Sequence, residues 1–178
     1  MPKALPGVRS IILEVARKQL CEGGYNAMTL RSVSAECNIA IGTIYHYFAS
    51  KDELLLALID GQWLSMLSGL SEKCLRVASA REAIQYTYDA LSEFFGCLYR
   101  VLKDVPATSY DVFSPQKHRE RIREQLTKLL QPTLDQYSRT KNPFLSVFIC
   151  DAVLFESENK RPFADFYSVI SPLFKDAA

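Results

Sequence analysis

Histidine is scarce in this chain, and the sequence patterns that most often mark enzyme sites are missing. Only two histidines, His46 and His118, occur among the 178 residues. Neither a glycine-rich phosphate-binding loop nor a glycine-flanked serine is present. Neighbouring carboxylates such as Asp52 and Glu53 would point to different sides of a helix, so they cannot share a metal or a substrate. We therefore expect no enzymatic activity, no metal site and no cofactor.

Long apolar runs and a disulfide framework are also missing. No run of eighteen apolar residues occurs, and the first ten residues, MPKALPGVRS, lack the apolar centre of a signal peptide. Because nothing in the sequence indicates a membrane or export, we expect a cytoplasmic protein. The cysteines are odd in number and widely scattered, which favours buried, reduced thiols over disulfides or a metal site; they are Cys21, Cys37, Cys74, Cys97 and Cys150.

Apolar residues, by contrast, make up 48% of the chain, enough for a substantial core. They recur at spacings of three and four residues, which predicts an all-α protein. We expect a first helix from Val8 to Leu20, closed by Gly23 and Gly24, and a long helix from Lys51 to about Cys74. Ser79 and Glu82 form a capping box that begins another long helix, which continues to Leu102.

The second half of the chain predicts three further helices. Ala107 to Phe113 is expected to be a short irregular connection, followed by a helix capped by Ser114 and Pro115. Pro132 should kink or restart that helix, because proline has no backbone N–H to donate. Two very apolar helices then begin at Asn142-Pro143 and at Arg161-Pro162. The first of these two should be buried on nearly every side.

The most informative stretch runs from Met28 to Leu54 and predicts a helix-turn-helix. Thr29 is a good N-cap for a short helix to Cys37, and Asn38 tolerates the left-handed backbone of a sharp turn. A second short helix follows from Ala40 to Phe48. Ser50 with Glu53 is a capping box for the helix that begins at Lys51. In this geometry the second short helix can project into a DNA groove.

These residues resemble the TetR family of transcriptional regulators over roughly residues 8–60. Gly24-Tyr25, Thr29 and Val33 are followed in order by Gly42 to Phe48 and Ser50 to Leu54. The resemblance implies an all-α homodimer, with an N-terminal DNA-binding domain (1–50) and a C-terminal helical domain (51–178) that binds an inducer and dimerises. The helix from 51 to about 74 would link the two. Asn38 and Ala40 depart from the glycine and the serine or threonine that are common in the family.

We expect the DNA-contacting residues to be Thr29, Arg31, Ile41, Gly42, Thr43, Tyr45, His46 and Lys51. Tyr45 and Lys51 match family positions that contact phosphates, and Thr43 and His46 are the best candidates for contacts to base edges. Residues 1–60 carry six basic and six acidic side chains and therefore no net charge. This balance predicts modest non-specific affinity. It also leaves open an alternative, a TetR-like helical interaction module or co-regulator that does not itself read DNA.

Two further predictions, an effector pocket and a dimer interface, concern the second domain. Its aromatic side chains exceed the needs of a core, and we expect a subset to line a pocket for a small, mostly apolar or aromatic effector that releases DNA: Trp63, Tyr86, Tyr88, Phe95, Tyr99, Phe113 and Tyr137. The last two helices carry more apolar surface than one chain of this size can cover. A homodimer would bury that surface through Phe148, Ile149, Phe155, Phe163, Phe166, Tyr167 and Ile170. Such a dimer would bind a near-palindromic DNA operator.

Overall fold

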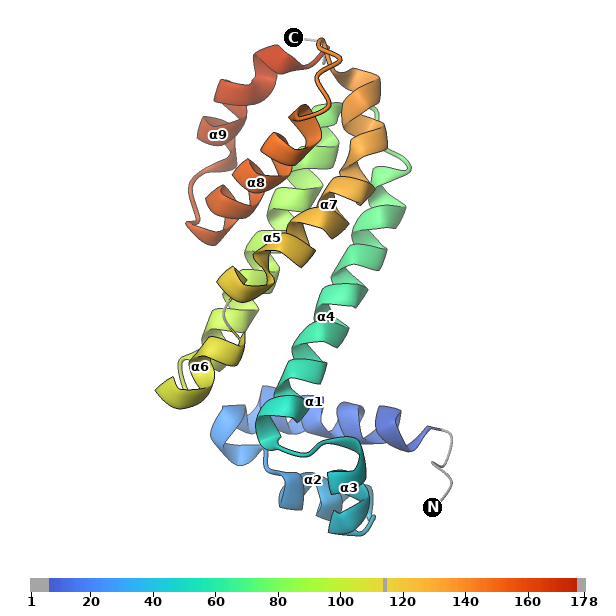
Figure 1. The fold of residues 1–178 in the computed structure, drawn as a ribbon, viewed down its shortest axis with the longest axis vertical. Coiled ribbons are helices and arrows are strands. Elements are labelled where there is room, and N and C mark those ends of the chain that lie inside the picture. The colour runs from blue at the N-terminus through green and yellow to red at the C-terminus, as the bar shows by residue number, and fades with distance from the viewer. Residues whose placement is uncertain (1–6, 114, 176–178) are drawn as a thin grey trace. The chain divides into compact units, whose positions relative to one another are not determined.

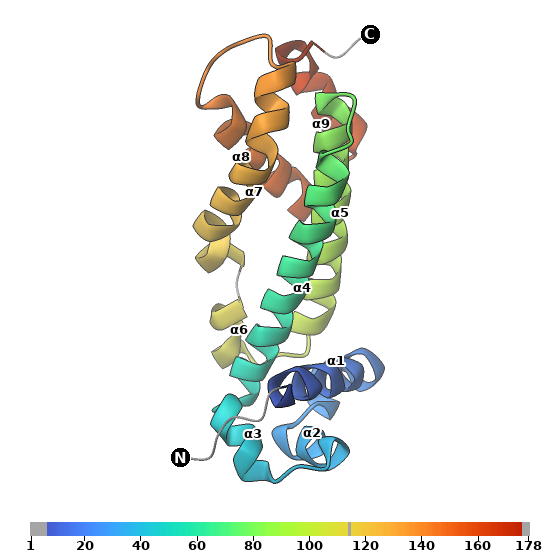
Figure 2. The same cartoon turned by 90° about the vertical axis from the view of Figure 1, so that its right-hand side faces the viewer.

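The computed structural model describes residues 7–113 and 115–175, and within these ranges the chain is all-helical (Figures 1 and 2). It divides into two compact units, each described separately below. The first contains Met1–Gln62 and Leu98–Ser114, and the second contains Trp63–Cys97 and Pro115–Ala178. The division falls inside two long helices, α4 (Lys51–Cys74) and α5 (Ala80–Leu102). The functional boundary at residue 50 remains a prediction.

The first unit contains α1 (Val8–Ala27), α2 (Leu30–Cys37), α3 (Ile41–Tyr47), the beginning of α4 and the end of α5. Its core is apolar and takes side chains from each of the first four helices, among them Ile12, Ala16, Val33, Ile44, Phe48, Leu54 and Leu55. Burial of each of these side chains except that of Ala16 contributes about 1.5–3 kcal/mol. The apolar spacing in the sequence therefore identified the packed faces of these helices.

The first unit also contains a helix that the sequence analysis missed. Ala107–Phe113 forms α6, whereas we expected an irregular connection. Pro106 stands immediately before it, and the carbonyl of Pro106 accepts a hydrogen bond from the N–H of Ser109 at 2.9 Å. A proline with its φ fixed near the helical value starts a turn readily, so one short helix forms without an amphipathic pattern of its own.

The second unit contains the remainder of α4 and α5, followed by α7 (Pro115–Tyr137), α8 (Leu145–Glu158), α9 (Phe163–Ile170) and a 3-10 turn at Ser171–Leu173. Helices α7 and α8 pack against each other (Figure 1). The N–H of Lys175 donates to the carbonyl of Tyr137 at 2.8 Å, which ties the end of the described chain to the end of α7.

The two units test two further sequence expectations, on Pro132 and on the cysteines. Pro132 does not restart α7, which continues to Tyr137; the proline is exposed, so water can bind the carbonyl that loses its helical partner. Cys74 and Cys150 are buried as expected, but Cys21 is exposed on α1. The cap predicted at Ser114 lies outside the described residues.

Helix α4 begins and ends where the sequence predicted. Its first turn is capped twice: the N–H of Glu53 donates to Ser50 Oγ at 3.1 Å, and the N–H of Ala49 donates to the Glu53 carboxylate at 2.6 Å. The same pattern recurs before α5 with Ser79 and Glu82. By length and composition α4 could cross a membrane, but core helices of globular proteins pass the same test.

Candidate nucleic-acid interface

Helix α2 is fixed at its start by the predicted cap. The side-chain oxygen of Thr29 accepts a hydrogen bond from the N–H of Ser32 at 3.0 Å, and Ser32 Oγ accepts one from the N–H of Thr29 at 2.9 Å. Two N–H groups that a helix leaves unpaired are thereby satisfied. The partner in the box is Ser32, which the sequence analysis did not single out. Arg31 follows Thr29 and its side chain is exposed.

The turn between α2 and α3 is held by its own hydrogen bonds. Asn38 adopts φ 52 and ψ 43, the left-handed conformation that its short polar side chain tolerates. Ser34 is buried, and its hydroxyl donates to the carbonyl of Ile39 at 2.6 Å. The N–H of Ile39 donates back to the carbonyl of Ser34 at 3.2 Å. Asn38 can therefore replace the glycine common in the family without disturbing the turn.

Helix α3 presents one face to the core and the other to solvent. Ile44 and Phe48 are buried, whereas Ile41, Gly42, Tyr45 and His46 are exposed and Thr43 is half-buried. Ala40 occupies the N-cap position and makes no side-chain cap. The N–H of Thr43 donates to the carbonyl of Ala40 at 2.8 Å, so the first turn of α3 is held by backbone alone.

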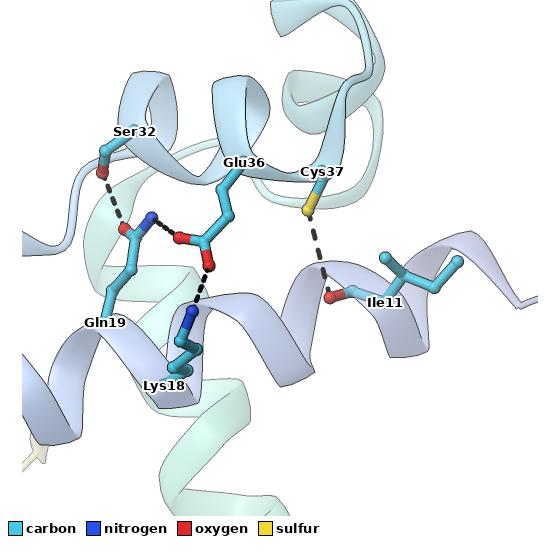
Figure 3. Close-up of polar contacts among 6 residues, drawn as sticks. All are labelled: Ile11, Lys18, Gln19, Ser32, Glu36 and Cys37. Carbon is cyan, nitrogen blue, oxygen red and sulfur yellow. Dashed lines mark hydrogen bonds and ion pairs between the residues drawn. The ribbon is translucent and has the colours of Figure 1, made fainter.

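Helices α1 and α2 are joined by a polar network that the sequence did not reveal (Figure 3). Lys18 Nζ donates to Glu36 Oε1 at 2.8 Å, and Gln19 Nε2 donates to Glu36 Oε2 at 2.7 Å. The Ser32 hydroxyl donates to Gln19 Oε1 at 2.8 Å. The hydrogen bond from Lys18 is the main cause that lowers the pKa of Glu36, and the same contact raises the pKa of Lys18.

The N-terminus of α4 carries the remaining predicted contact, Lys51. Its Nζ lies 3.6 Å from the centroid of the Tyr25 ring, and its side chain is half-buried. Burial lowers the pKa of Lys51, and the nearby Asp52 acts in the opposite direction. All eight residues predicted to contact DNA thus lie in the first unit, on α2 and its N-cap, on α3 and at the first residue of α4. The structure adds Tyr25 and Ser32 as their supports.

Residues 12–58 match the family described as bacterial regulatory proteins, tetR family. This segment belongs to the TetR family. The HTH-type transcriptional regulator UidR of Escherichia coli strain K12 is 37% identical over 51 residues, which are 29% of this chain and 26% of UidR. The matched part is therefore about a quarter of the length of that curated relative.

Solved TetR-family structures resemble nearly the whole chain. The TetR family repressor AlkX from Dietzia, implicated in biodegradation of n-alkanes, has a TM-score of 0.63 at 13% identity, covering 97% of this chain and 96% of AlkX. The transcriptional regulator FadR from Bacillus subtilis, in complex with stearoyl-CoA, has a TM-score of 0.52 at 18% identity, covering 95% of this chain and 99% of FadR. The chain therefore has the TetR fold, a helix-turn-helix domain followed by a helical domain.

The aromatic residues predicted to bind an effector are distributed over both units of this TetR-like chain. Phe113 and Tyr99 belong to the first unit, and the other five belong to the second. Trp63 is buried and its Nε1 donates to Gln125 Oε1 at 2.7 Å, while Tyr86 is exposed beneath Lys73. The hydroxyl of Tyr88 donates to the carbonyl of Arg161. These contacts are those of core packing and surface stacking.

One cavity in the second unit does include a predicted residue. Phe95 lines it together with Arg119, Ile122, Leu154 and Glu158, and its volume is about 10 Å³. This volume is close to the minimum that holds one water molecule. Arg119 and Glu158 form an ion pair at its edge, with 3.0 Å between the nitrogen and the oxygen. This cavity is therefore too small for a ligand larger than a water molecule.

The residues predicted for the dimer interface fall into two groups. Phe148 and Phe155 are 57% and 46% exposed on α8, whereas Ile149, Phe166, Tyr167 and Ile170 are buried inside the chain itself and Phe163 is half-buried. The expectation that α8 is buried on nearly every side is therefore wrong for the single chain. Phe144 and Val169 were not predicted and are 74% and 76% exposed. These four exposed apolar side chains, Phe144, Phe148, Phe155 and Val169, are named the α8/α9 apolar face.

Proposed function

We propose that this chain is a DNA-binding transcriptional regulator that acts as a repressor. The observation that carries the proposal is the geometry of α2 and α3, with Thr43, Tyr45 and His46 on a helix whose opposite side is anchored by Ile44 and Phe48. Hydroxyl and imidazole groups can donate to phosphates or read base edges, and Gly42 allows close approach of the backbone. The TetR-family match of residues 12–58 supports the same assignment.

We further propose that the regulator binds a near-palindromic operator as a homodimer in the cytoplasm. The support is the α8/α9 apolar face, whose four large apolar side chains are exposed on the single chain and would be covered in a dimer. A twofold dimer presents two copies of α3 to one duplex, and half-sites one helical turn apart lie roughly 34 to 36 Å from each other. No membrane contact is needed for this function.

The proposed signal is a small, largely apolar or aromatic molecule that releases the operator. The aromatic side chains of the second unit and the small cavity beside Phe95 support a ligand of this class. The FadR structure contains stearoyl-CoA, so the fold accommodates a long-chain ligand in that protein. The ion pair of Arg119 with Glu158 at the cavity would be the polar group nearest to such a ligand.

A TetR-like interaction module without DNA affinity is the competing proposal. Ile41 is 37% exposed on α3, Ala40 provides no capping side chain, and residues 1–60 have no net charge. Each feature would suit a protein partner better than a phosphate backbone.

Selection from a pool of random-sequence duplexes separates the two proposals. The purified full chain is incubated with the pool, bound duplexes are amplified and sequenced, and enriched sequences are tested by gel shift. A regulator enriches a near-palindrome and shifts it. A pool that stays unenriched after repeated rounds, with no shift at low salt, would leave the interaction module as the better description.

A further inference from the structure

Two opposite charges stand side by side at the start of α4, and one tyrosine contacts both. Lys51 and Asp52 are the first two residues of the helix. The Nζ of Lys51 lies 3.6 Å from the centroid of the Tyr25 ring, and Tyr25 Oη donates to Oδ1 of Asp52 at 3.0 Å. The face of the ring therefore contacts the cation, and the hydroxyl donates a hydrogen bond to the carboxylate.

Tyr25 is well placed to hold this arrangement. Its side chain is only 6% exposed, and it follows Gly24, whose φ of 73 and ψ of −175 interrupt the helical backbone of α1. Only glycine adopts this conformation without strain. Burial, followed by the hydrogen bond to Asp52, raises the pKa of Tyr25 to about 12. The hydroxyl therefore remains a donor to Asp52 at every physiological pH.

The two contacts have different consequences for the lysine. An aromatic ring attracts an ammonium group through its quadrupole and takes up none of its positive charge. A carboxylate partner would instead form an ion pair with the ammonium and compete with a phosphate for it. By engaging Asp52 through its hydroxyl, Tyr25 keeps one carboxylate oxygen occupied, while the Lys51 ammonium lies on the ring.

We propose that Tyr25 is a positioning residue for DNA binding, which separates Lys51 from Asp52 so that the Lys51 ammonium can contact a phosphate. The proposal rests on the proposed DNA-binding function. It assigns to a buried core tyrosine a role that acts only through Lys51. A purely structural Tyr25 would stabilise the first unit without any specific effect on the phosphate contact.

The test uses full-length variants and a random-sequence duplex, with affinity measured by fluorescence anisotropy over a range of salt concentrations. Tyr25→Leu removes ring and hydroxyl. Because one phosphate contact contributes about 0.9 to the salt slope, we expect the slope to fall by about 0.9 and binding to weaken roughly eightfold at 0.1 M salt. Lys51→Ala should have the same effect, and the double variant should lose nothing more. An unchanged slope in folded Tyr25→Leu, or additive losses in the double variant, would overturn the proposal.

Conservative variants keep the test informative if Tyr25→Leu unfolds. Tyr25→Phe retains the ring and frees Asp52, so DNA binding should weaken; Asp52→Asn in that background should restore it. A merely structural role predicts loss of thermal stability without such rescue, and absence of rescue would therefore overturn the proposal. Lys73→Ala is the matched control, because Lys73 lies over another tyrosine ring, that of Tyr86, in the second unit. It should leave the salt slope unchanged.

An NMR measurement without DNA separates this proposal from the proposed function. The ε-methylene protons of Lys51, assigned from their loss in Lys51→Ala, should be shifted upfield by the Tyr25 ring, and the shift should vanish in Tyr25→Leu. A wild-type protein without the shift would overturn the arrangement even if it binds DNA. A wild-type protein with the shift but without affinity for any duplex would overturn the DNA-binding function and, with it, the role of Tyr25.

Discussion

We propose that single residues of the first unit divide into those that contact base edges and those that contact phosphates. His46 is exposed on α3, whereas Lys51 stands at the start of α4 beside a tyrosine ring. We expect Lys51→Ala to weaken binding to all duplexes by a similar factor, because a phosphate contact carries no sequence information. His46→Ala should change which sequences are enriched. Selection experiments on both variants check this division, and a uniform loss of affinity in His46→Ala would contradict the base-reading role.

The network of Lys18 with Glu36 gives an acid-sensitive contribution to stability. The pKa of Glu36 is lowered from its ordinary value of 4.5, chiefly by the hydrogen bond from Lys18. The stabilisation is therefore complete above about pH 4.5 and is lost as the pH falls through the folded-state pKa. We expect Glu36→Gln to be less sensitive to acid than the wild type, measured by urea unfolding across a pH series. Equal pH profiles for the two proteins would contradict the assignment.

Sequence spacing predicted which side of a helix each residue occupies better than it predicted which residues contact each other. Thr29, Asn38, Ile44 and Phe48 all take the positions that propensity and periodicity indicate. The Lys18–Glu36 pair could not be predicted, because it depends on the angle at which α1 and α2 cross. The same limit applies to the contact between Tyr25 and Lys51, which are far apart in sequence.

Helices were predictable where caps and apolar periodicity coincide. Ser50 with Glu53 marks the start of α4, and Ser79 with Glu82 precedes α5. Helix α6 was missed because one short helix after Pro106 carries no amphipathic repeat. The role of the predicted effector residues stays a prediction, because helical spacing gives a direction for each aromatic ring but not the depth at which it packs.

The α8/α9 apolar face is the element on which dimerisation is expected to depend. Phe148 is exposed, so Phe148→Glu should leave the monomer folded but place an unpaired charge in the interface, at a cost of about 3–5 kcal/mol. Sedimentation velocity should then show monomers where the wild type is dimeric. Phe166 is a poor probe, since it is 9% exposed and its replacement would disturb the core.

Two control variants accompany this prediction. Leu75 is 83% exposed outside the α8/α9 apolar face, so Leu75→Glu should leave the dimer intact. Ile149 is fully buried, and Ile149→Ala should lower the free energy of unfolding by about 2–5 kcal/mol. A wild type that is already monomeric at micromolar concentration would refute the interface altogether.

At the scale of the whole molecule, the effector must act by linkage. A ligand that binds the DNA-free conformation more tightly by about 1–3 kcal/mol weakens DNA binding roughly 5- to 150-fold. Because the cavity beside Phe95 is about 10 Å³, a ligand that binds there has to expand that cavity. We expect hydrophobic compounds that raise the melting temperature also to release the duplex in a gel shift. A compound that stabilises the protein yet leaves DNA affinity unchanged would argue against coupling.

The central claim, that two copies of the α2–α3 unit read one duplex, is tested most directly by changing the spacing of the selected near-palindrome. Inserting about five base pairs between its halves turns one half-site by half a helical turn to the opposite side of the duplex. Affinity is measured by anisotropy for the original and the extended duplex at the same salt concentration. The account predicts that the extended duplex binds no more tightly than a random sequence. Equal affinity for both duplexes would contradict it.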